Sequence, residues 1–520
     1  MFGRQIMRGR RGAPEIQRRI GVLRGGVEVA PALDAKVLAV EIDRFALQQL
    51  APDGQVFVGD LIALVMREVD ALGGVIQVFT RKGREGFQPS VRVGAGTDGA
   101  REASATLAGG NDRLRYSVTA GHERSDGFNA KPSGNPDRDG YRSQSVSGRL
   151  GWKLAPGHEL EATLLDSEQK AGYDGFLPGQ DDQGQQDLRT LGLSWSAAWS
   201  DTWKTRVGVT RGTDRYETTP SPYLTNTRID TYLLRNEWRM GTATLSADLE
   251  RREDRLTNGS TTPEQNDRDQ NALALGYTLR HGAHTLQLNA RRDDDSEFGA
   301  HTTGSLAYGY ALSRTLQLTG SVGTAFRAPT LYQRFSEYGV ATLRPETSHN
   351  AELGLRYAQG RSSFSAVVYR NRLSNLILFG GAGTCASSFG CYANTARAQY
   401  QGVTLAASHH WARVQWHGSI DLQNPRDLAT GKQLARRAKR HATFGADTQW
   451  AGWTLGAEVQ ASGRRFDNAA NTNVLGGYAL VNLYASTRVA RDYTLLARID
   501  NLGDKDYQLA RTYATPGRTL

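Results

Sequence analysis

Cysteine and methionine are scarce in this chain of 520 residues, which has two of the first and four of the second. Long apolar runs are missing as well: no stretch of about 18 consecutive apolar residues occurs, so a transmembrane helix is not expected. Hydrophobic residues make up only 39% of the chain. That share lies below the roughly 45–50% of soluble domains. The chain is also too long for one ordinary soluble domain, and no proline- or serine-rich linker divides it after about residue 84.

What the chain does have is glycine, with 58 residues, and a two-residue alternation of apolar and polar side chains. In RLRYSVTAGHE, residues 113–123, one strand face would carry Leu114, Tyr116, Val118 and Ala120 and the other the polar residues between them. HTLQLNA at 284–290 and TLQLTGSV at 315–322 repeat the pattern. Strict period two predicts β-strands, and an apolar face backed by a charged one is typical of a membrane β-barrel with a polar lumen.

Connections of two lengths support this interpretation. Short polar turns such as 109–113 and 154–159 contrast with long Asp-, Asn- and Gly-rich loops such as 124–141 and 170–187. Short turns at one end and long loops at the other are typical of outer-membrane barrels. The sequence therefore predicts an all-β fold: a transmembrane antiparallel β-barrel of about 22 strands between residue 88 and the end, with a partial or degenerate N-terminal plug. A water-soluble sandwich would not need so many strands with one consistently apolar face.

The net charge of +10 invites a nucleic-acid interpretation, but the 63 Lys and Arg are interspersed with 53 Asp and Glu. No basic block with interleaved aromatic residues stands out, so no nucleic-acid partner is expected. A charged barrel interior and solvated loops explain these residues better.

The two cysteines, Cys385 and Cys391, lie close together in the loop-like segment GAGTCASSFGCYAN. They suggest a disulfide formed in an oxidising compartment such as the periplasm or the cell surface. A two-cysteine metal site is less favoured, because no His or third Cys lies nearby.

Several segments resemble TonB-dependent outer-membrane receptors. LGGVIQVFTRKG at 72–83 is similar to the end of their plug domain, and IDNLGDKDYQLARTYATPGRTL at 499–520 to their C-terminal signature. The segments 326–339 and 343–357 also look like that family. The resemblance implies import across the outer membrane of a Gram-negative cell by a multi-pass β-barrel that acts as a monomer. It further implies the energy-coupling protein TonB as a partner and outer-membrane lipid or lipopolysaccharide as surroundings.

Two acidic loops bring the resemblance closer to the cobalamin (vitamin B12) receptor branch. In that branch a D-x-D-G loop and a Tyr-Asp loop bind calcium and order the substrate-facing loops. By motif position the resemblance implies seven candidate calcium ligands: Asp126, Asn135, Asp137, Asp139, Tyr173, Asp174 and Asp187. Calcium takes six to eight oxygens, and crowded carboxylates repel one another unless a cation separates them. Asp, Asn and Gly are also ordinary turn formers, and Asp181 and Asp182 remain possible substitutes in the set.

Cobalamin contacts are also carried by resemblance. Gly175 follows the Tyr-Asp pair at a position whose backbone would meet the corrin, and Arg465 resembles a loop arginine that would bond the ligand. Arg437 is a further candidate, although a lumen-facing charge explains it as well. No catalytic constellation is found, so the chain is not expected to be an enzyme or to need a redox or organic cofactor; calcium is the expected structural ion.

The ends depart from the family pattern. We expect residues 1–83 to be a partial or degenerate plug and residues 84–520 a barrel with a truncated last strand. The first residues have no apolar signal-peptide core, and a TonB-contacting box is not recognised. Three alternatives therefore stay open: a receptor for an iron-siderophore chelate, a passive pore, and a non-functional fragment.

Overall fold

The computed structural model describes residues 82–175, 179–261, 265–380 and 385–520. The expected plug remnant, residues 1–83, lies outside the described residues except for its last two. Within the described ranges strands dominate, and their bounds follow in chain order. They are β1 (Gly86–Ala95), β2 (Arg101–Gly110), β3 (Leu114–Phe128), β4 (Asp139–Ala155), β5 (His158–Asp174), β6 (Asp181–Ala198), β7 (Trp203–Thr219), β8 (Tyr223–Met240), β9 (Ala243–Asn258), β10 (Asp267–His281), β11 (His284–Asp295), β12 (Gly299–Ala311), β13 (Leu316–Arg327), β14 (Glu346–Gln359), β15 (Ser362–Gly380), β16 (Cys391–Trp411), β17 (Val414–Gln423), β18 (Arg426–Asp427), β19 (Arg440–Trp450), β20 (Trp453–Ser462), β21 (Arg465–Phe466), β22 (Val474–Leu475), β23 (Tyr478–Ala490) and β24 (Tyr493–Ile499).

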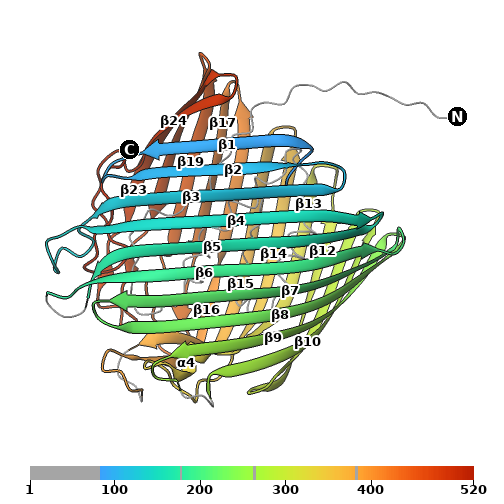
Figure 1. The fold of residues 1–520 in the computed structure, drawn as a ribbon, viewed down its shortest axis with the longest axis horizontal. Coiled ribbons are helices and arrows are strands. Elements are labelled where there is room, and N and C mark those ends of the chain that lie inside the picture. The colour runs from blue at the N-terminus through green and yellow to red at the C-terminus, as the bar shows by residue number, and fades with distance from the viewer. Residues whose placement is uncertain (1–81, 176–178, 262–264, 381–384) are drawn as a thin grey trace.

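Each long strand pairs antiparallel with the next long strand along the chain, and together they curve into the wall of a barrel (Figure 1). The main sheet has 22 strands, one of which is the two-residue β18 beside β16. The predicted all-β barrel of about 22 strands is confirmed. Within the described ranges β1 pairs only with β2 and β24 only with β23, so these two strands are the edges of the sheet.

Side-chain alternation sets the two faces of the wall, as predicted. On β3 the outward Val118 is 46% exposed, whereas its neighbour Ser117 is 6% exposed. Leu193 and Leu249, on β6 and β9, are likewise 52% and 53% exposed. Moving leucine and valine side chains out of water is favourable, so this apolar outer band requires lipid around it. No helix in the described part of the chain is long and apolar enough to cross a membrane.

The connections fall into two classes, which lie at opposite ends of the barrel. Turns such as that between β4 and β5 hold two residues, while the segments 328–345 and 424–439, the second of which contains β18, are long, as is the segment 500–518 that follows β24. Antiparallel succession places all three long segments at one end, which we call the loop end (Figure 1). The predicted asymmetry of short turns and long loops is therefore confirmed, but the two predicted loop ranges were too long. β3 runs to Phe128 and β4 begins at Asp139, while β5 runs to Asp174 and β6 begins at Asp181, so the 170–187 segment is mostly strand.

One long connection crosses the loop end and carries α4 (Leu331–Phe335). Thr330 caps α4 through a reciprocal capping box, and Leu331 and Phe335 pack against Leu256 at the end of β9. The disulfide predicted from sequence is present between Cys385 and Cys391, with their Cα atoms 5.7 Å apart. It joins the connection between β15 and β16 to the first residue of β16. It lies next to the segment that follows α4, where the Glu337 carbonyl accepts from the Ser387 amide.

Candidate calcium and ligand site at the loop end

Carboxylates gather where the β3–β4 loop meets the ends of β5 and β6. Asp174 ends β5 directly opposite Asp181, the first residue of β6. Its side chain is 8% exposed, and one carboxylate oxygen accepts a hydrogen bond from the Asn135 amide at 3.0 Å. The other oxygen, Oδ2, is buried without a hydrogen-bond partner. A buried carboxylate oxygen without a donor is unfavourable unless a cation approaches it.

The charges of these carboxylates act on one another. β4 and β6 have 17 and 18 residues, more than the roughly 9–11 that cross a bilayer, so their loop ends lie outside it. Burial raises the pKa of Asp139 against a lowering by the hydrogen bond from the Ala130 amide, and the charges of Asp174, Asp137 and Asp181 raise it further.

Asp181 behaves in the same way. Burial raises its pKa first, and then the charges of Asp137, Asp174 and Asp182. Mutual repulsion of this kind is what a bound cation relieves. We call Asp137, Asp139, Asp174 and Asp181 the acidic cluster.

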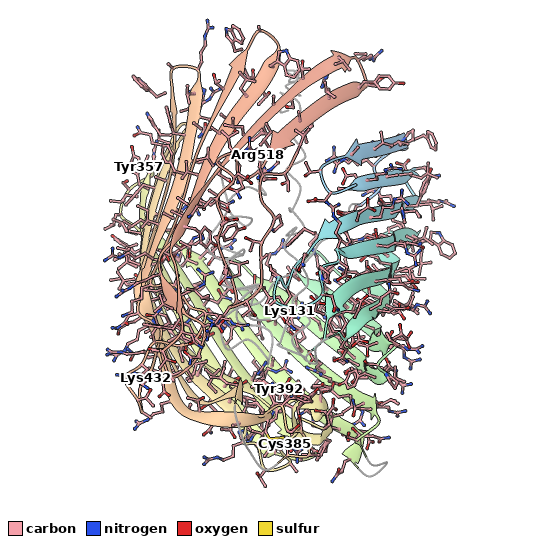
Figure 2. The ribbon with its side chains drawn as sticks, turned by 90° about the vertical axis from the view of Figure 1, so that its left-hand side faces the viewer. Lys131, Tyr357, Cys385, Tyr392, Lys432 and Arg518 are labelled. Atoms are coloured by element: carbon pink, nitrogen blue, oxygen red, sulfur yellow. A yellow bond between two sulfur atoms is a disulfide. The ribbon has the colours of Figure 1, made fainter. Side chains whose placement is uncertain are left out.

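The described surroundings of the acidic cluster supply no balancing cation. Among the described residues, no Lys or Arg lies within ion-pair distance of any of its four members. The ammonium group of Lys131 instead donates to the carbonyl oxygen of Gly175 at 2.7 Å. Figure 2 views the loop end and places Lys131 toward the middle of the ring of strands. The cluster is thus left with its negative charge.

Asp182 and Tyr173 form a second, separate arrangement beside the cluster. Asp182 is 3% exposed, and its two carboxylate oxygens accept from the Ser221 amide at 3.0 Å and from the Gln180 side chain at 2.8 Å. It therefore ties the β5–β6 connection to the β7–β8 connection. Tyr173 lies opposite Asp182, and burial, followed by the charge of Asp182, raises the pKa of its phenol.

Two of the sequence-derived ligand candidates lie elsewhere. Asp187 is six residues along β6 from Asp181, about 20 Å at the rise of a strand, and its carboxylate accepts from the Gln185 side chain at 3.1 Å. Asp126 lies beside the β1–β2 turn, where its amide donates to the Asp98 carbonyl at 2.8 Å. The structure brings Asp137, Asp139 and Asp174 together, places Asn135 next to them through its backbone, and adds Asp181.

The donor set of the acidic cluster suits one class of metal. Carboxylate and backbone carbonyl oxygens are hard ligands, which calcium prefers, and neither His nor Cys belongs to the cluster. Across the described ranges, no group of three or more His, Cys, Asp or Glu side chains is already arranged as a metal cage. The unpartnered Oδ2 of Asp174 and the raised pKa values of Asp139 and Asp181 nevertheless fit a cation that draws these carboxylates closer.

The three residues expected to contact cobalamin lie in different connections. Gly175 is buried in the β5–β6 hairpin, where a Cβ atom would come within 2.3 Å of the Gln180 side chain. Arg465 is 4% exposed; one terminal nitrogen donates to the Gln508 carbonyl at 2.8 Å, and the other, Nη1, is buried without a partner. Arg437 lies in the 424–439 segment and donates to the Ala435 carbonyl at 3.3 Å.

Sequence analysis missed a group of tyrosines at the loop end. The hydroxyls of Tyr223 and Tyr332 share a hydrogen bond of 2.5 Å, and the Tyr332 ring meets the edge of Tyr392 at 6.3 Å between centroids. Next to them, Glu337 has a buried carboxylate oxygen without a hydrogen-bond partner, and burial raises its pKa. Figure 2 places Tyr392 near Cys385 at the same side of the opening. Tyr332 and Tyr338 belong to the 326–339 segment that resembles the receptor family. That resemblance was the sequence feature that could have indicated the tyrosine group.

Comparison with known proteins fits this geometry. Residues 86–502 match the family described as TonB dependent receptor-like, beta-barrel. The chain therefore belongs to the TonB-dependent receptor family, and it is an outer-membrane transporter rather than an enzyme. Membership implies a TonB partner and a transported ligand.

Two relatives that the chain resembles over most of its length are vitamin B12 transporters. The chain is 27% identical over 470 residues to the vitamin B12 transporter BtuB of Photobacterium profundum, covering 86% of this chain and 75% of that protein. It is 26% identical over 514 residues to the BtuB of Vibrio vulnificus, covering 94% and 80%. Among solved structures, a ferric enterobactin receptor mutant of Pseudomonas aeruginosa superimposes with a TM-score of 0.74 at 19% identity, covering 86% of this chain and 82% of that one. The copper transporter OprC gives 0.73 at 20% identity, covering 85% and 81%. At these identities the two solved structures support the fold alone.

Proposed function

We propose that this transporter carries cobalamin and that calcium orders the loops which receive it. The observation that carries the proposal is the acidic cluster, with the buried, unpartnered Oδ2 of Asp174 at its centre. The similarity to vitamin B12 transporters over most of the chain supports the same cargo.

Calcium, when bound, supplies positive charge and oxygen coordination to the cluster. The residues that would hold it are Asp137, Asp139, Asp174 and Asp181, which come from the β3–β4 loop and the ends of β4, β5 and β6. Because these strand ends and the loop then share one cation, the loop is held against the β5–β6 hairpin. The hairpin includes Gly175, the position that the family resemblance assigns to the corrin, and its carbonyl oxygen accepts from Lys131 at 2.7 Å.

The tyrosine group supplies the other side of the receiving surface. Tyr223, Tyr332 and Tyr392 join the start of β8, α4 and the start of β16 through ring and hydroxyl contacts. Tyr392 is 5% exposed and packs in the core, whereas Tyr223 and Tyr332 are half-buried. Their rings offer flat apolar area together with a polar tip, which suits a ligand with an apolar ring and amide arms. Binding at this surface followed by TonB-driven opening would complete transport.

The test is a binding titration of the purified full chain with cyanocobalamin, in calcium and in a chelator of calcium. We expect saturable binding in calcium and a loss of at least tenfold in affinity in the chelator. Asp174→Asn should bind weakly under both conditions, whereas the matched control Asp187→Asn should bind like the unaltered chain. Ferric enterobactin serves as the competing cargo.

Binding of ferric enterobactin in preference to cyanocobalamin would contradict the cobalamin assignment and favour an iron-chelate receptor. Cobalamin binding of equal affinity with and without calcium would contradict the proposed role of the acidic cluster, but not the cobalamin assignment. A large steady current in a planar bilayer, unaffected by cobalamin, would instead favour a passive pore.

A further inference from the structure

Glu337 differs from the other buried carboxylates of the described residues in what surrounds it. Five carboxylate side chains bury an oxygen atom that has no hydrogen-bond partner. Three of them have a basic side chain within ion-pair distance: Asp293 beside Arg291, Asp295 beside Arg268 and Asp447 beside His417. The fourth is Asp174 of the acidic cluster. Glu337 is the fifth, and within the described ranges no basic side chain lies within ion-pair distance of it.

The carboxylate of Glu337 lies at the inner side of the loop end, in the connection that follows α4. Burial raises its pKa, and hydrogen bonding from its own amide, from Tyr223 and from Asn258 lowers it. Side chains alternate along a strand, and Leu224 and Leu249 are exposed on the outer face at 41% and 53%. Tyr223 and Asn258 lie one and nine positions from these leucines, so both point into the mouth of the barrel. Glu337 therefore lies where a cargo would enter.

Basic side chains near Glu337 in the sequence are engaged elsewhere. Arg334, three residues earlier, pairs with Glu297. Its guanidinium also lies 4.9 and 4.5 Å from the ring centroids of Phe298 and Phe335. The positive charge of α4 is thus met on the side of β11 and β12, and the charge of Glu337 is not.

Aromatic rings surround this carboxylate where a cation would otherwise be expected. The hydroxyl of Tyr223 shares its hydrogen bond with the hydroxyl of Tyr332, and the ring of Tyr338 meets the edge of Phe379 at 5.6 Å between centroids. Rings exclude water, so the charge of Glu337 is weakly screened, and the faces of tyrosine rings themselves attract cations. A positively charged group is therefore favoured at this part of the mouth.

We propose that Glu337 selects the charge of the cargo and favours a cationic corrinoid over a neutral one. The inference rests on the proposed function, since it concerns the form in which cobalamin binds. Cobalamin with cyanide on the cobalt is neutral, whereas cobalamin with water in that position carries one positive charge. The two molecules differ little in shape, so a difference in their affinities reports charge.

The test compares the affinities of the purified full chain for aquacobalamin and cyanocobalamin, in calcium, at neutral pH and low salt. We expect aquacobalamin to bind about tenfold more tightly, because a weakly screened carboxylate attracts only the charged form. Glu337→Gln keeps the shape of the side chain. It should weaken aquacobalamin binding about tenfold and change cyanocobalamin binding by less than about twofold. Glu337→Asp keeps the charge and should retain the preference.

Two controls separate this charge from other effects. Asp506→Asn removes the same charge from an exposed position in the 500–518 segment, where water screens it, and should leave the preference unchanged. In mildly alkaline buffer the cobalt-bound water loses its proton, so the cargo becomes neutral and the preference should disappear. Heat-dependent gel mobility reports the folding of every variant.

Equal affinity for the two corrinoids in the unaltered chain would overturn the inference without touching the cobalamin assignment. Equal weakening of both corrinoids in Glu337→Gln would also overturn it, because that result would indicate a structural role. A preference that persists in Glu337→Gln would overturn it as well, and would indicate that a histidine binds the cobalt in place of water. Binding of neither corrinoid would instead contradict the proposed function itself.

Discussion

Carboxylates in the barrel wall and carboxylates in the first two acidic loops have opposite surroundings. In the wall, Asp248 lies 2.8 Å from Arg235, Asp254 lies 2.6 Å from Arg268, and Glu346 pairs with Arg327. All of these carboxylates are buried, and each has its own arginine. The acidic cluster is without such partners throughout the described residues.

In the wall, the chain provides an arginine for each of these carboxylates. In the acidic cluster, the described residues provide no counter-charge. A buried carboxylate costs several kcal/mol unless it is paired. The wall meets that cost within the fold, and it is therefore complete without an added ion. The loops leave it unmet at Asp174, and a cation from solution would meet it there under the proposed function.

Breaking a wall pair should have the largest effect. Arg327→Met leaves Glu346, which is fully buried, without its cation, although Glu346 still accepts from the Ile377 amide at 2.7 Å. We expect the free energy of unfolding to fall by about 3–5 kcal/mol. Urea unfolding of the detergent-solubilised chain, followed by circular dichroism, measures it.

The double variant Arg327→Met/Glu346→Gln is the control for this pair. It removes both charges and should recover most of the loss, because no uncompensated charge is left in the wall. Equal stability of the single variant and the unaltered chain would mean that the wall carboxylates do not depend on their arginines.

Removing a charge from the acidic cluster should raise the stability of the calcium-free chain, whereas breaking a wall pair lowers it. Asp174→Asn removes one of four mutually repelling charges, so the calcium-free chain should resist heat slightly better. Calcium affinity should fall on the order of 100-fold, because ligand charge sets the strength of such sites. Isothermal titration with calcium measures the affinity, and Asp187→Asn is the control because its carboxylate lies away from the cluster. Matching losses in the two variants would show that the cluster is not the site.

The same contrast explains what the sequence could predict. The outward positions of Leu114 and Val118 follow from a period of two, which is a local property of any strand. Membership of the acidic cluster depends instead on where a hairpin turns: β6 begins at Asp181, which brings that residue opposite Asp174 and carries Asp187 six residues away. Spacing alone does not reveal that boundary.

Contacts between distant segments were still harder to predict. The hydroxyls of Tyr223 and Tyr332 meet across 109 residues of chain, through the folding of α4 over the loop end. No periodic pattern in either segment predicts that contact.

Acid should change the stability of the loops through two of their carboxylates. Burial and neighbouring charges raise the pKa values of Asp139 and Asp181 above the model-peptide value of 3.8. Without calcium, the folded loops therefore hold protons that the unfolded chain has already released. Their stability is greatest below the unfolded pKa and declines as the pH rises through the raised values.

Calcium affinity should change in the other direction across the same window, since the ion competes with those protons. We expect it to rise on the order of tenfold between about pH 4 and about pH 7. Calcium titrations at several pH values, run also on Asp181→Asn, check this. A calcium affinity that stays constant over the window would mean that these carboxylates are not ligands.

The smallest effect is expected where a wall charge is paired but exposed. Arg189 lies 2.6 Å from Asp166, yet the two side chains are 62% and 41% exposed, so water already screens both charges. Arg189→Gln should lower the free energy of unfolding by less than about 1 kcal/mol, and added salt should reduce even that difference. The same urea measurement, made at low and high salt, compares it with Arg327→Met. A loss as large as that of the buried pair would mean that pairing in this wall matters whatever the burial of the two charges.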